Sequence, residues 1–469
     1  MVGIKSCGVY VPLWRMDLAS AKEGWRGERA IANFDEDSLT MGVAAAINCL
    51  KGVDRKTIDG LYFASSTFPY KEKQVSVIAA TTLDLRSDVI TADFGNSLRA
   101  GTNALRAAVD ALKSGTVKQI LVIASDMRLP MPGSDFEREF GDGAAAVLLS
   151  STEAKVEIKG GFSVADEIFD VWRTDEDKFV RTWEERFTLD EGYFRVLPNA
   201  VSGLMKKVGL TSKDFARAVF NGPNARRHSE MGKKLGFAET QLQPPLFGSV
   251  GDTGNASALM MLAAALEKTK AGDKVLLANY GSGADAFLLE VKQEVGQNIT
   301  LAEYIASKAV LKDYKRYLNW RGLVEMAMGR RRPPTPSPSA TCLWREIDQN
   351  MRLQGVKCQK CGMVQYPPQT VCFNCKTVNQ FESYSLYDKK GKLTTFTEDM
   401  ATPNPDPPLV LAVVDFEGGG RIWFYMTDKG GKKLEIGMPV EVTFRKLFTN
   451  EGIHNYFWKC LPGRSLKEG

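Results

Sequence analysis

The stretch FGNSLRAGTNAL, residues 94–105, decides the fold, because it is typical of a strand end, a tight turn and the start of an apolar-faced helix. Such a junction presents the unpaired N–H groups of a helix N-terminus, which favour developing negative charge. The turn offers Ser97, whose unactivated hydroxyl is a poor nucleophile, and Leu98, which has no reactive group. The stretch therefore predicts an α/β site without an evident nucleophile.

The order turn, helix, strand, Gly-rich turn and strand occurs twice in the chain. We expect one α/β unit to be duplicated, with VGDTGNASALM (250–260) as the partner of residues 94–105 and the two helix N-termini close together. The alternative, that unrelated α/β segments produce the likeness, stays open. The matching parts are helices at 102–115 and 256–272, strands at 117–126 and 273–283, and the motifs GDGAAAVLLS (141–150) and GSGADAFLLE (281–290).

Composition limits the class of protein. The chain has 469 residues, of which 44% are apolar and 25% charged, as expected for a soluble globular protein of two or three domains. Its net charge of +5, from 61 basic and 56 acidic residues, is mild and favours no nucleic acid. The sequence shows neither a leader nor a long apolar run, so we expect a cytoplasmic protein without a membrane partner.

Four of the eight cysteines form two CxxC pairs: Cys358 with Cys361, and Cys372 with Cys375. This spacing predicts a closed tetrahedral site of four thiolates, which holds zinc in a structural role. Iron in a rubredoxin-like site is the alternative, since such a site accepts both metals. The scattered Cys7, Cys49, Cys342 and Cys460 are interpreted as core or surface thiols.

The C-terminal third of the chain predicts a separate all-β module. A Pro/Ser-rich linker at 329–340 precedes a short amphipathic helix and zinc ribbon at 341–380, and five β-rich runs at 381–469 predict a small OB-fold barrel. Since OB barrels often bind oligonucleotides, a nucleic-acid-binding protein is a weaker alternative. Four aromatic residues are expected in the barrel core or an interface: Trp423, Phe424, Tyr425 and Trp458.

Residues 1–328 resemble the thiolase superfamily, specifically 3-hydroxy-3-methylglutaryl-CoA synthases. The resemblance implies a five-layered, duplicated αβαβα fold, a dimer and acyl-CoA ligands. Residues 335–465 resemble the zinc-ribbon/OB-fold proteins that accompany such enzymes and help to bind CoA. The motifs of the first resemblance are GVYVPLWR (8–15), DEDSLTMGVAAA (35–46), SSTFPYKEKQ (65–74), SLRAGTNAL (97–105), FNGPNARRHSEMGKKLGF (220–237), GDTGNASALM (251–260), YGSGADAF (280–287) and YLNWRG (317–322).

The resemblance implies a cysteine nucleophile, a glutamate acid/base and a histidine. The motif match puts Leu98 at the cysteine position, Ser66 at the glutamate position and Asn221 at the histidine position. We therefore expect no Claisen chemistry of the usual kind. Either the chain is the degenerate subunit of a thiolase-type complex, or Ser97, Asn221, Asn255 or Tyr70 polarises a thioester in a changed mechanism. Ser97 is expected mainly to cap the following helix.

The resulting hypothesis is an acyltransferase or C–C lyase that handles acyl-CoA as a homodimer or with a catalytic thiolase-type subunit. The alternative is a scaffold that binds or channels CoA thioesters without catalysis. Four basic residues are candidates for contacts with the CoA phosphates, although a solvated basic helix face is equally consistent. They are Arg226, Arg227, Lys233 and Lys234. His228, in the same segment, is expected on the solvated surface.

Overall fold

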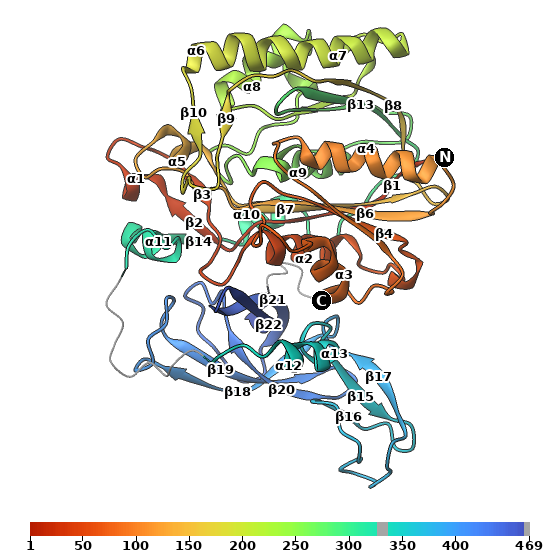
Figure 1. The fold of residues 1–469 in the computed structure, drawn as a ribbon, viewed down its shortest axis with the longest axis vertical. Coiled ribbons are helices and arrows are strands. Elements are labelled where there is room, and N and C mark those ends of the chain that lie inside the picture. Colours follow the sequence, from red (N-terminus) through yellow and green to blue (C-terminus); the bar gives the residue numbers. More distant parts are fainter. Residues whose placement is uncertain (326–335, 464–469) are drawn as a thin grey trace. The chain divides into compact units, whose positions relative to one another are not determined.

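The computed structural model describes residues 1–325 and 336–463, which pack as two compact units (Figure 1). The predicted linker at 329–340 lies partly outside the described residues; of its described part, residues 336–339 contain no helix or strand, and Ala340 begins a helix. The domain ranges drawn from the sequence stay predictions. The N-terminal unit comprises Met1–Ala32 and Asp37–Lys312, and the C-terminal unit comprises Asn33–Glu36 and Asp313–Gly469.

A nine-stranded sheet organises the N-terminal unit, in the order β11-β12-β13-β8-β1-β7-β6-β4-β5. Its halves repeat one pattern, since β1, β7, β6 and β4 pair in the same directions as β8, β13, β12 and β11. This repeat confirms the predicted duplication. The strands are β1 (Gly3–Tyr10), β4 (Gly60–Ala64), β5 (Ile90–Phe94), β6 (Gln119–Asp126), β7 (Gly143–Ser150), β8 (Val156–Val164), β11 (Arg217–Phe220), β12 (Lys274–Tyr280) and β13 (Ala284–Val291).

Helices form three layers around the two half-sheets, which gives the five layers expected from the sequence. Figure 1 shows α4 and α9 between the half-sheets, α2 and α3 outside one half, and α7 and α8 outside the other. The helices of these layers are α2 (Ser38–Cys49), α3 (Val75–Thr82), α4 (Ala100–Lys113), α7 (Phe194–Val208), α8 (Ala225–Lys234) and α9 (Ser257–Leu266).

The central layer follows from residue pattern. Helix α9, SALMMLAAAL, is apolar on all sides and is buried along its whole length. Every residue of β6 and β7 is buried; β7 is a continuous run of small or apolar residues, and β6 is apolar between Gln119 and Ser125. Gly101 lets α4 approach the α9 side, because a Cβ there would lie 2.8 Å from the Asn255 carbonyl oxygen. The predicted meeting of the two helix starts is confirmed.

Smaller elements border the sheet of the N-terminal unit. A three-stranded sheet has the order β14-β2-β3, and β9 pairs with β10. The elements are β2 (Trp14–Asp17), β3 (Glu28–Ala30), β9 (Val171–Trp172), β10 (Arg181–Thr182), β14 (Ala309–Leu311), α1 (Leu18–Ala21), α5 (Asp135–Glu139), α6 (Glu185–Phe187), α10 (Leu301–Ala306), the 3₁₀ turns η1 (Arg55–Thr57), η3 (Ser212–Asp214), η4 (Glu239–Gln241) and η5 (Gly254–Ala256), and the π-helical segment η2 (Thr188–Tyr193).

The C-terminal unit contains a three-stranded sheet, β16-β15-β17, and a closed barrel, β18-β19-β20-β22-β21. The five barrel strands coincide with the β-rich runs of the sequence, so the OB-type barrel is confirmed. The elements are α11 (Tyr314–Trp320), α12 (Ala340–Arg345), α13 (Ile347–Asn350), β15 (Gln354–Cys358), β16 (Val364–Gln365), β17 (Phe381–Ser385), β18 (Gly391–Asp399), β19 (Leu409–Phe416), β20 (Arg421–Met426), β21 (Pro439–Asn450) and β22 (Ile453–Pro462).

One sequence expectation for this unit needs correction. The single amphipathic helix expected after residue 341 is two short helices, α12 and α13, because the chain leaves helical geometry around Glu346. Of the aromatic residues expected in the barrel core or an interface, Phe424 and Trp458 lie in the core, whereas Trp423 is 59% exposed, since alternate residues of β20 face outward; an interface role for Trp423 stays a prediction. Across the described residues, no helix combines the length and apolarity needed to cross a membrane.

Candidate functional site

The turn between β5 and α4 places Ser97 and Leu98 beside the turn that follows β12. The Ser97 hydroxyl donates to the Gly281 carbonyl oxygen at 2.8 Å and accepts the Arg99 N–H at 3.2 Å. Both partners are backbone groups, and a carbonyl oxygen is too weak a base to activate a hydroxyl. The Ser97 hydroxyl thus holds the turn that precedes α4, but it does not cap the helix as the sequence predicted, because the N-cap residue is Arg99 and no side chain makes a cap bond there.

Leu98 is held by its backbone and packs closely. Its carbonyl oxygen accepts a bond from the Asn279 side chain at 3.0 Å. A Cβ on Gly281 would lie 2.9 Å from the Leu98 Cβ, so glycine is required for the β12–β13 turn to reach this loop. The helix N-terminus here is therefore bordered by an aliphatic side chain and a glycine turn.

Asn221, at the end of β11, is bound to β12 through both ends of its amide. Its Nδ2 donates to the Tyr280 carbonyl oxygen at 3.0 Å, and its Oδ1 accepts the Tyr280 N–H at 2.8 Å. The backbone carbonyl of Asn221 accepts the Tyr193 hydroxyl at 2.9 Å. One amide hydrogen of Asn221 is not used by these bonds, so the side chain can still donate to a ligand oxygen.

Asn255 and Ser66 meet at a residue that sequence reasoning missed, Asp126 at the end of β6. The Asn255 backbone N–H and Nδ2 donate to one Asp126 carboxylate oxygen at 2.8 and 3.0 Å. The other oxygen accepts the Ser66 N–H at 2.7 Å and the hydroxyls of Ser65 and Thr67 at 2.9 and 3.0 Å. Asp126 is fully buried and organises the ends of three segments. The pattern that could have identified Asp126 is an acidic residue at the end of an apolar, buried strand.

A second buried carboxylate anchors the start of α4. Asp285 accepts from the Arg99 guanidinium at 3.2 Å, from the Thr102 hydroxyl at 2.7 Å and from the Ser163 hydroxyl at 2.6 Å. The Arg99 Nε also donates to the Gly281 carbonyl oxygen at 3.0 Å. Sequence reasoning missed these positioning groups, because their partners come from strands far apart in the chain.

The structure thus gathers the sequence-predicted residues through shared partners. Ser97, Leu98 and Asn221 attach to the end of β12 and its following turn, and Ser66 attaches with Asn255 to Asp126. Asn255 also accepts the Gly101 N–H at 3.1 Å, which ties the two halves of the duplicated unit together. Ser97, Asn221 and Asn255, three of the polar groups predicted to act on substrate, carry structural hydrogen bonds.

His228 is not on the surface, contrary to the sequence expectation. Its side chain is buried on α8 and stacks on Phe220 with a ring separation of 4.5 Å. Burial lowers its pKa to about 4, and its Nε2 has no hydrogen-bond partner among the described residues. The basic neighbours in the sequence suggested exposure, but helical spacing turns this residue inward.

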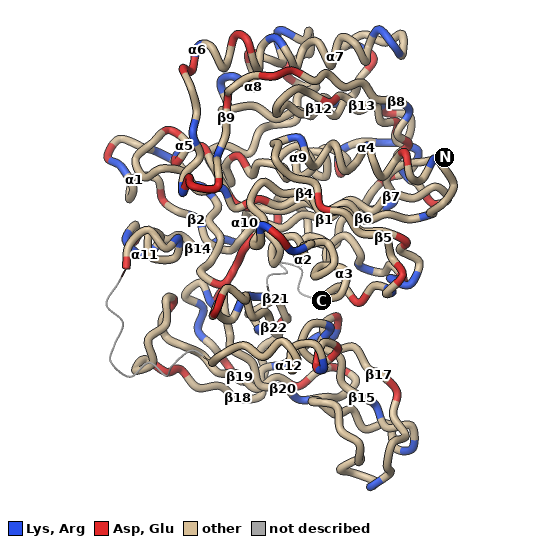
Figure 2. The backbone as a smooth tube through the Cα atoms, viewed as in Figure 1, with Lys and Arg blue, Asp and Glu red and all other residues tan. Residues whose placement is uncertain are grey.

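The four basic residues of α8 lie on its exposed side, where Figure 2 shows acidic positions among the basic ones. Arg226 binds Glu230 at 2.8 Å, and Arg227 binds Glu230 at 2.9 Å and Glu185 at 3.5 Å. Lys233 and Lys234 are exposed at the C-terminal end of the helix. A phosphate would therefore have to compete with Glu230 for the two arginines.

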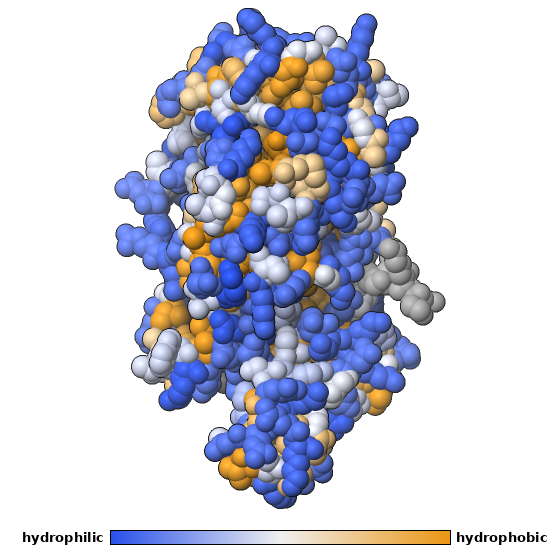
Figure 3. All heavy atoms as spheres, turned by 90° about the vertical axis from the view of Figure 1, so that its right-hand side faces the viewer, coloured by the Kyte–Doolittle hydropathy of each residue, from blue (hydrophilic) through white to orange (hydrophobic). Residues whose placement is uncertain are grey.

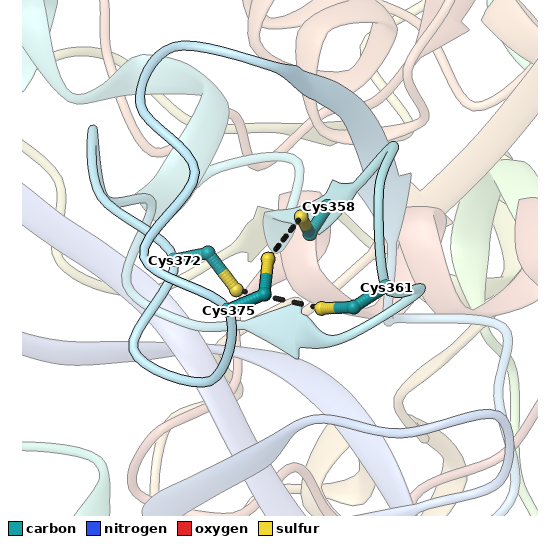
Figure 4. A group of neighbouring side chains, drawn as sticks. All are labelled: Cys358, Cys361, Cys372 and Cys375. Atoms are coloured by element: carbon teal, nitrogen blue, oxygen red, sulfur yellow. Dashed lines mark hydrogen bonds between the residues drawn. The ribbon is translucent and has the colours of Figure 1, made fainter.

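The cysteine cluster forms in the C-terminal unit as its spacing predicts (Figure 4). The four sulfur atoms lie within 4.8 Å of one another, and the Cys358–Cys375 and Cys361–Cys372 sulfur distances are both 3.6 Å. Tetrahedral Zn–S bonds of about 2.3 Å require sulfur separations of about 3.8 Å, so this donor set fits a zinc ion. Hydrogen bonds from Thr377 lower the Cys375 pKa to about 6, which favours the thiolate needed for metal binding.

Three segments match described protein families. Residues 93–164 match 3-oxoacyl-[acyl-carrier-protein (ACP)] synthase III, and residues 205–290 match the C-terminal part of the same enzyme class. Residues 386–445 match the C-terminal OB-fold domain of ChsH2. The third match independently supports the barrel assignment.

Comparison with individual proteins shows a similarity to hydroxymethylglutaryl-CoA synthases over about two thirds of the chain. The chain is 33% identical to hydroxymethylglutaryl-CoA synthase of Thermococcus gammatolerans over 335 residues, which cover 68% of this chain and 94% of that protein. It is 32% identical to the enzyme of Methanosarcina mazei over 348 residues, covering 70% and 99%.

Solved structures agree at the level of the fold. A crystal structure of HMG-CoA synthase complexed with CoA aligns with a TM-score of 0.60 at 18% identity, covering 72% of this chain and 95% of that one. The 3-oxoacyl-[acyl-carrier-protein] synthase III of Aquifex aeolicus aligns with a TM-score of 0.56 at 22% identity, covering 62% and 100%. The fold of the N-terminal unit is therefore thiolase-like.

Proposed function

Since the chain belongs to the hydroxymethylglutaryl-CoA synthase family, we propose that it handles acyl-CoA thioesters in a reaction that forms or cleaves a carbon–carbon bond. We further propose that it does so without a covalent acyl-enzyme at the β5–α4 turn. The observation that carries this second step is Leu98, which the motif match puts at the nucleophile position and which has no reactive group. Its neighbour Ser97 is bound to a carbonyl oxygen rather than to a base.

The test is intact-protein mass spectrometry after incubation with acetyl-CoA. We expect no acetyl adduct, because the Ser97 hydroxyl has no base to remove its proton. A Cys342→Ser variant serves as the control, since this exposed thiol can react without any active site. An acetyl group mapped to Ser97 would show a true nucleophile and refute the absence of an acyl-enzyme.

A scaffold or degenerate subunit is the second candidate function. It is favoured by the hydrogen bonds of Ser97, Asn221 and Asn255, all of which support the fold of the chain itself. Turnover of CoA thioesters by the purified chain separates the two candidates. A scaffold stays inert until a thiolase-type subunit is added, whereas an enzyme of changed mechanism turns over alone.

We propose contacts between the CoA phosphates and α8, through Arg226, Arg227, Lys233 and Lys234. The exposed cations of this helix support the proposal, although Glu230 neutralises part of their charge. Calorimetric titration with CoA at low and high salt tests it, since exposed ionic contacts weaken with salt. Charge removal at Lys233 and Lys234 should weaken binding a few fold; unchanged affinity would assign these residues to a solvated face.

We also propose a structural zinc ion at the cysteine cluster and an oligomeric protein. Four thiolates would close the coordination sphere, so the ion has no position for substrate.

An assembly is supported by strand β5, which forms an edge of the sheet, and by the apolar patches among hydrophilic residues in Figure 3. Metal analysis and light scattering test the two proposals separately.

The weaker alternative, an oligonucleotide-binding OB protein, receives little support from charge. In Figure 2 basic and acidic positions alternate along the described backbone rather than forming a basic stripe. Salt-dependent binding of single-stranded DNA or RNA by the full chain would restore this alternative.

A further inference from the structure

A pocket of about 760 Å³ opens in the N-terminal unit, where residues of β9, α6, η2 and the segments around them line it. Its apolar lining consists of one aliphatic and four aromatic side chains. They are Ile168, Phe169, Trp172, Trp183 and Phe187. A pocket of this size is in the range that holds a small-molecule group.

The aromatic side chains of this pocket are unusually exposed. Phe169 is 65%, Trp183 60% and Phe187 43% accessible, and the Phe169 and Trp172 rings stand at 89° with centroids 5.6 Å apart. A contiguous group of exposed large aromatic residues indicates a surface that another group covers. Aromatic rings receive a flat apolar group well, by stacking or by edge-to-face contact.

The polar rim argues against an anionic ligand. Arg195 is the cation of the described lining, and it binds both carboxylate oxygens of Asp166 at 2.8 and 2.9 Å and Glu191 at 3.3 Å. Its charge is thereby neutralised, and Glu167 adds a further carboxylate to the rim. A phosphate or carboxylate would be repelled here, whereas an uncharged apolar group would not.

The elements that line the pocket are bound to the residues of the candidate site. Arg173, next to Trp172, donates to the Ser66 carbonyl oxygen at 3.4 Å. Tyr193, at the end of η2, donates to the Asn221 carbonyl oxygen at 2.9 Å. Two hydrogen bonds therefore connect the elements that line the pocket to Ser66 and Asn221, two of the positions that the family resemblance assigns to chemistry.

We propose that this pocket receives the acyl group of the CoA thioester and that this group is bulky, uncharged and aromatic. The proposal rests on the proposed handling of acyl-CoA and names its substrate class. A two-carbon acyl group would leave the aromatic lining uncovered, whereas a benzoyl group would cover part of it. The expected signature is a preference for benzoyl-CoA over acetyl-CoA that depends on the pocket.

The experiment is calorimetric titration of the full chain with CoA, acetyl-CoA and benzoyl-CoA. We expect benzoyl-CoA to bind about tenfold more tightly than acetyl-CoA, because aromatic contacts add to its affinity. A Trp183→Ala variant should lose most of this preference and keep its affinity for acetyl-CoA. The matched control is Trp344→Ala, since Trp344 is 78% exposed on α12 and is no part of the pocket.

Each contrary outcome has a distinct meaning. Equal affinities for the two thioesters, or a preference that survives Trp183→Ala, would overturn the pocket proposal. A Trp183→Ala variant that changes the oligomeric state in light scattering, with its preference intact, would assign these aromatic residues to a subunit interface and overturn it as well.

Failure of the proposed function is recognised separately. If neither CoA nor acetyl-CoA binds, acyl-CoA handling fails, and N-acetylcysteamine thioesters of benzoate and acetate then probe the pocket without the nucleotide. If the benzoyl compound binds the native chain but not Trp183→Ala, the pocket is still a site for an aromatic group. Absence of that binding would overturn both proposals.

Discussion

The two candidate sites differ in how their chemistry is encoded. In the cysteine cluster all four ligands come from one short segment, and their side chains point at one another with sulfur distances of 3.6 Å. In the thiolase-like site Ser97, Asn221 and Asn255 come from distant turns, and their side chains are bound to the protein itself. The first arrangement brings four potential metal ligands together, whereas the side chains of the second bind the fold itself around a helix N-terminus.

The largest expected effect is the loss of metal from the cysteine cluster. Cys361→Ser removes one of four thiolates, so we expect the metal content to fall from about one ion per chain to well below one. Structural zinc binding contributes on the order of 10 kcal/mol and is coupled to folding, so the β15–β17 sheet should also lose its structure. Elemental analysis and protease sensitivity measure both effects.

The control for this prediction is Cys342→Ser, since Cys342 is exposed on α12 and outside the cluster. It should leave the metal content unchanged. An unchanged content in Cys361→Ser would contradict the closed site. Elemental analysis of the unmutated chain also identifies the ion and so decides between zinc and iron.

The next largest effect is expected at Asp126. Asp126→Ala leaves the buried Ser65 hydroxyl, the part-buried Thr67 hydroxyl and three N–H donors without their acceptor. Each unsatisfied buried group costs about 1–3 kcal/mol, and partial relaxation should leave a loss on the order of 4 kcal/mol in the free energy of unfolding. Urea denaturation followed by circular dichroism measures the loss.

The matched control is Asp175→Ala, because Asp175 is 83% exposed and pairs with the exposed Lys71 at 3.1 Å. A surface pair of this kind contributes about 0–1 kcal/mol. If Asp126→Ala were as mild as its control, the shared-acceptor description of the site would be wrong.

His228 gives a pH dependence of intermediate size. Its pKa of about 4 in the folded chain lies below the ordinary value near 6.5, so the unfolded chain binds the proton more readily. The stability it contributes is complete above about pH 6.5 and is lost as the pH falls toward 4, by about 3 kcal/mol. Unfolding measured from pH 7.5 to 4.5 should show this loss.

A His228→Phe variant keeps the stack on Phe220 and removes the titrating group. We expect a flatter pH profile between pH 6.5 and 4. An identical slope in the variant and the native chain would mean that other groups cause the acid sensitivity.

Sequence reasoning predicted what is encoded locally. The CxxC spacing, the five barrel strands and the repeated helix and strand order each depend on a continuous segment, and the structure contains all of them. The burial of His228 was missed because charged neighbours along the chain outweighed the helical period. Asp126 and Asp285 were missed because their partners come together only when strands from different parts of the chain align.

The C-terminal unit contains the clearest case of non-local encoding. Asn33–Glu36 packs with this unit, although more than two hundred residues separate it from the rest. The buried Arg445 binds Asp35 at 3.2 Å and Glu36 at 2.7 Å, and Lys459 binds Asp35 at 2.7 Å. Burial alone would raise the Asp35 pKa, but the two cations hold it below its ordinary value. No local pattern distinguishes these acids from solvated ones.

The smallest expected effect is at Ser97, and it tests the comparison between the two sites most directly. Ser97→Ala removes the bond to the Gly281 carbonyl oxygen and the acceptor of the Arg99 N–H, which should cost about 1 kcal/mol of stability. Because these partners are backbone groups, we expect the affinity for CoA thioesters to stay unchanged. Arg99 keeps its own bonds to Gly281 and Asp285, so the turn should retain its shape. Thermal unfolding and calorimetric titration of the same samples measure both quantities; a stable variant that loses thioester turnover or binding would instead make Ser97 a functional group of the site.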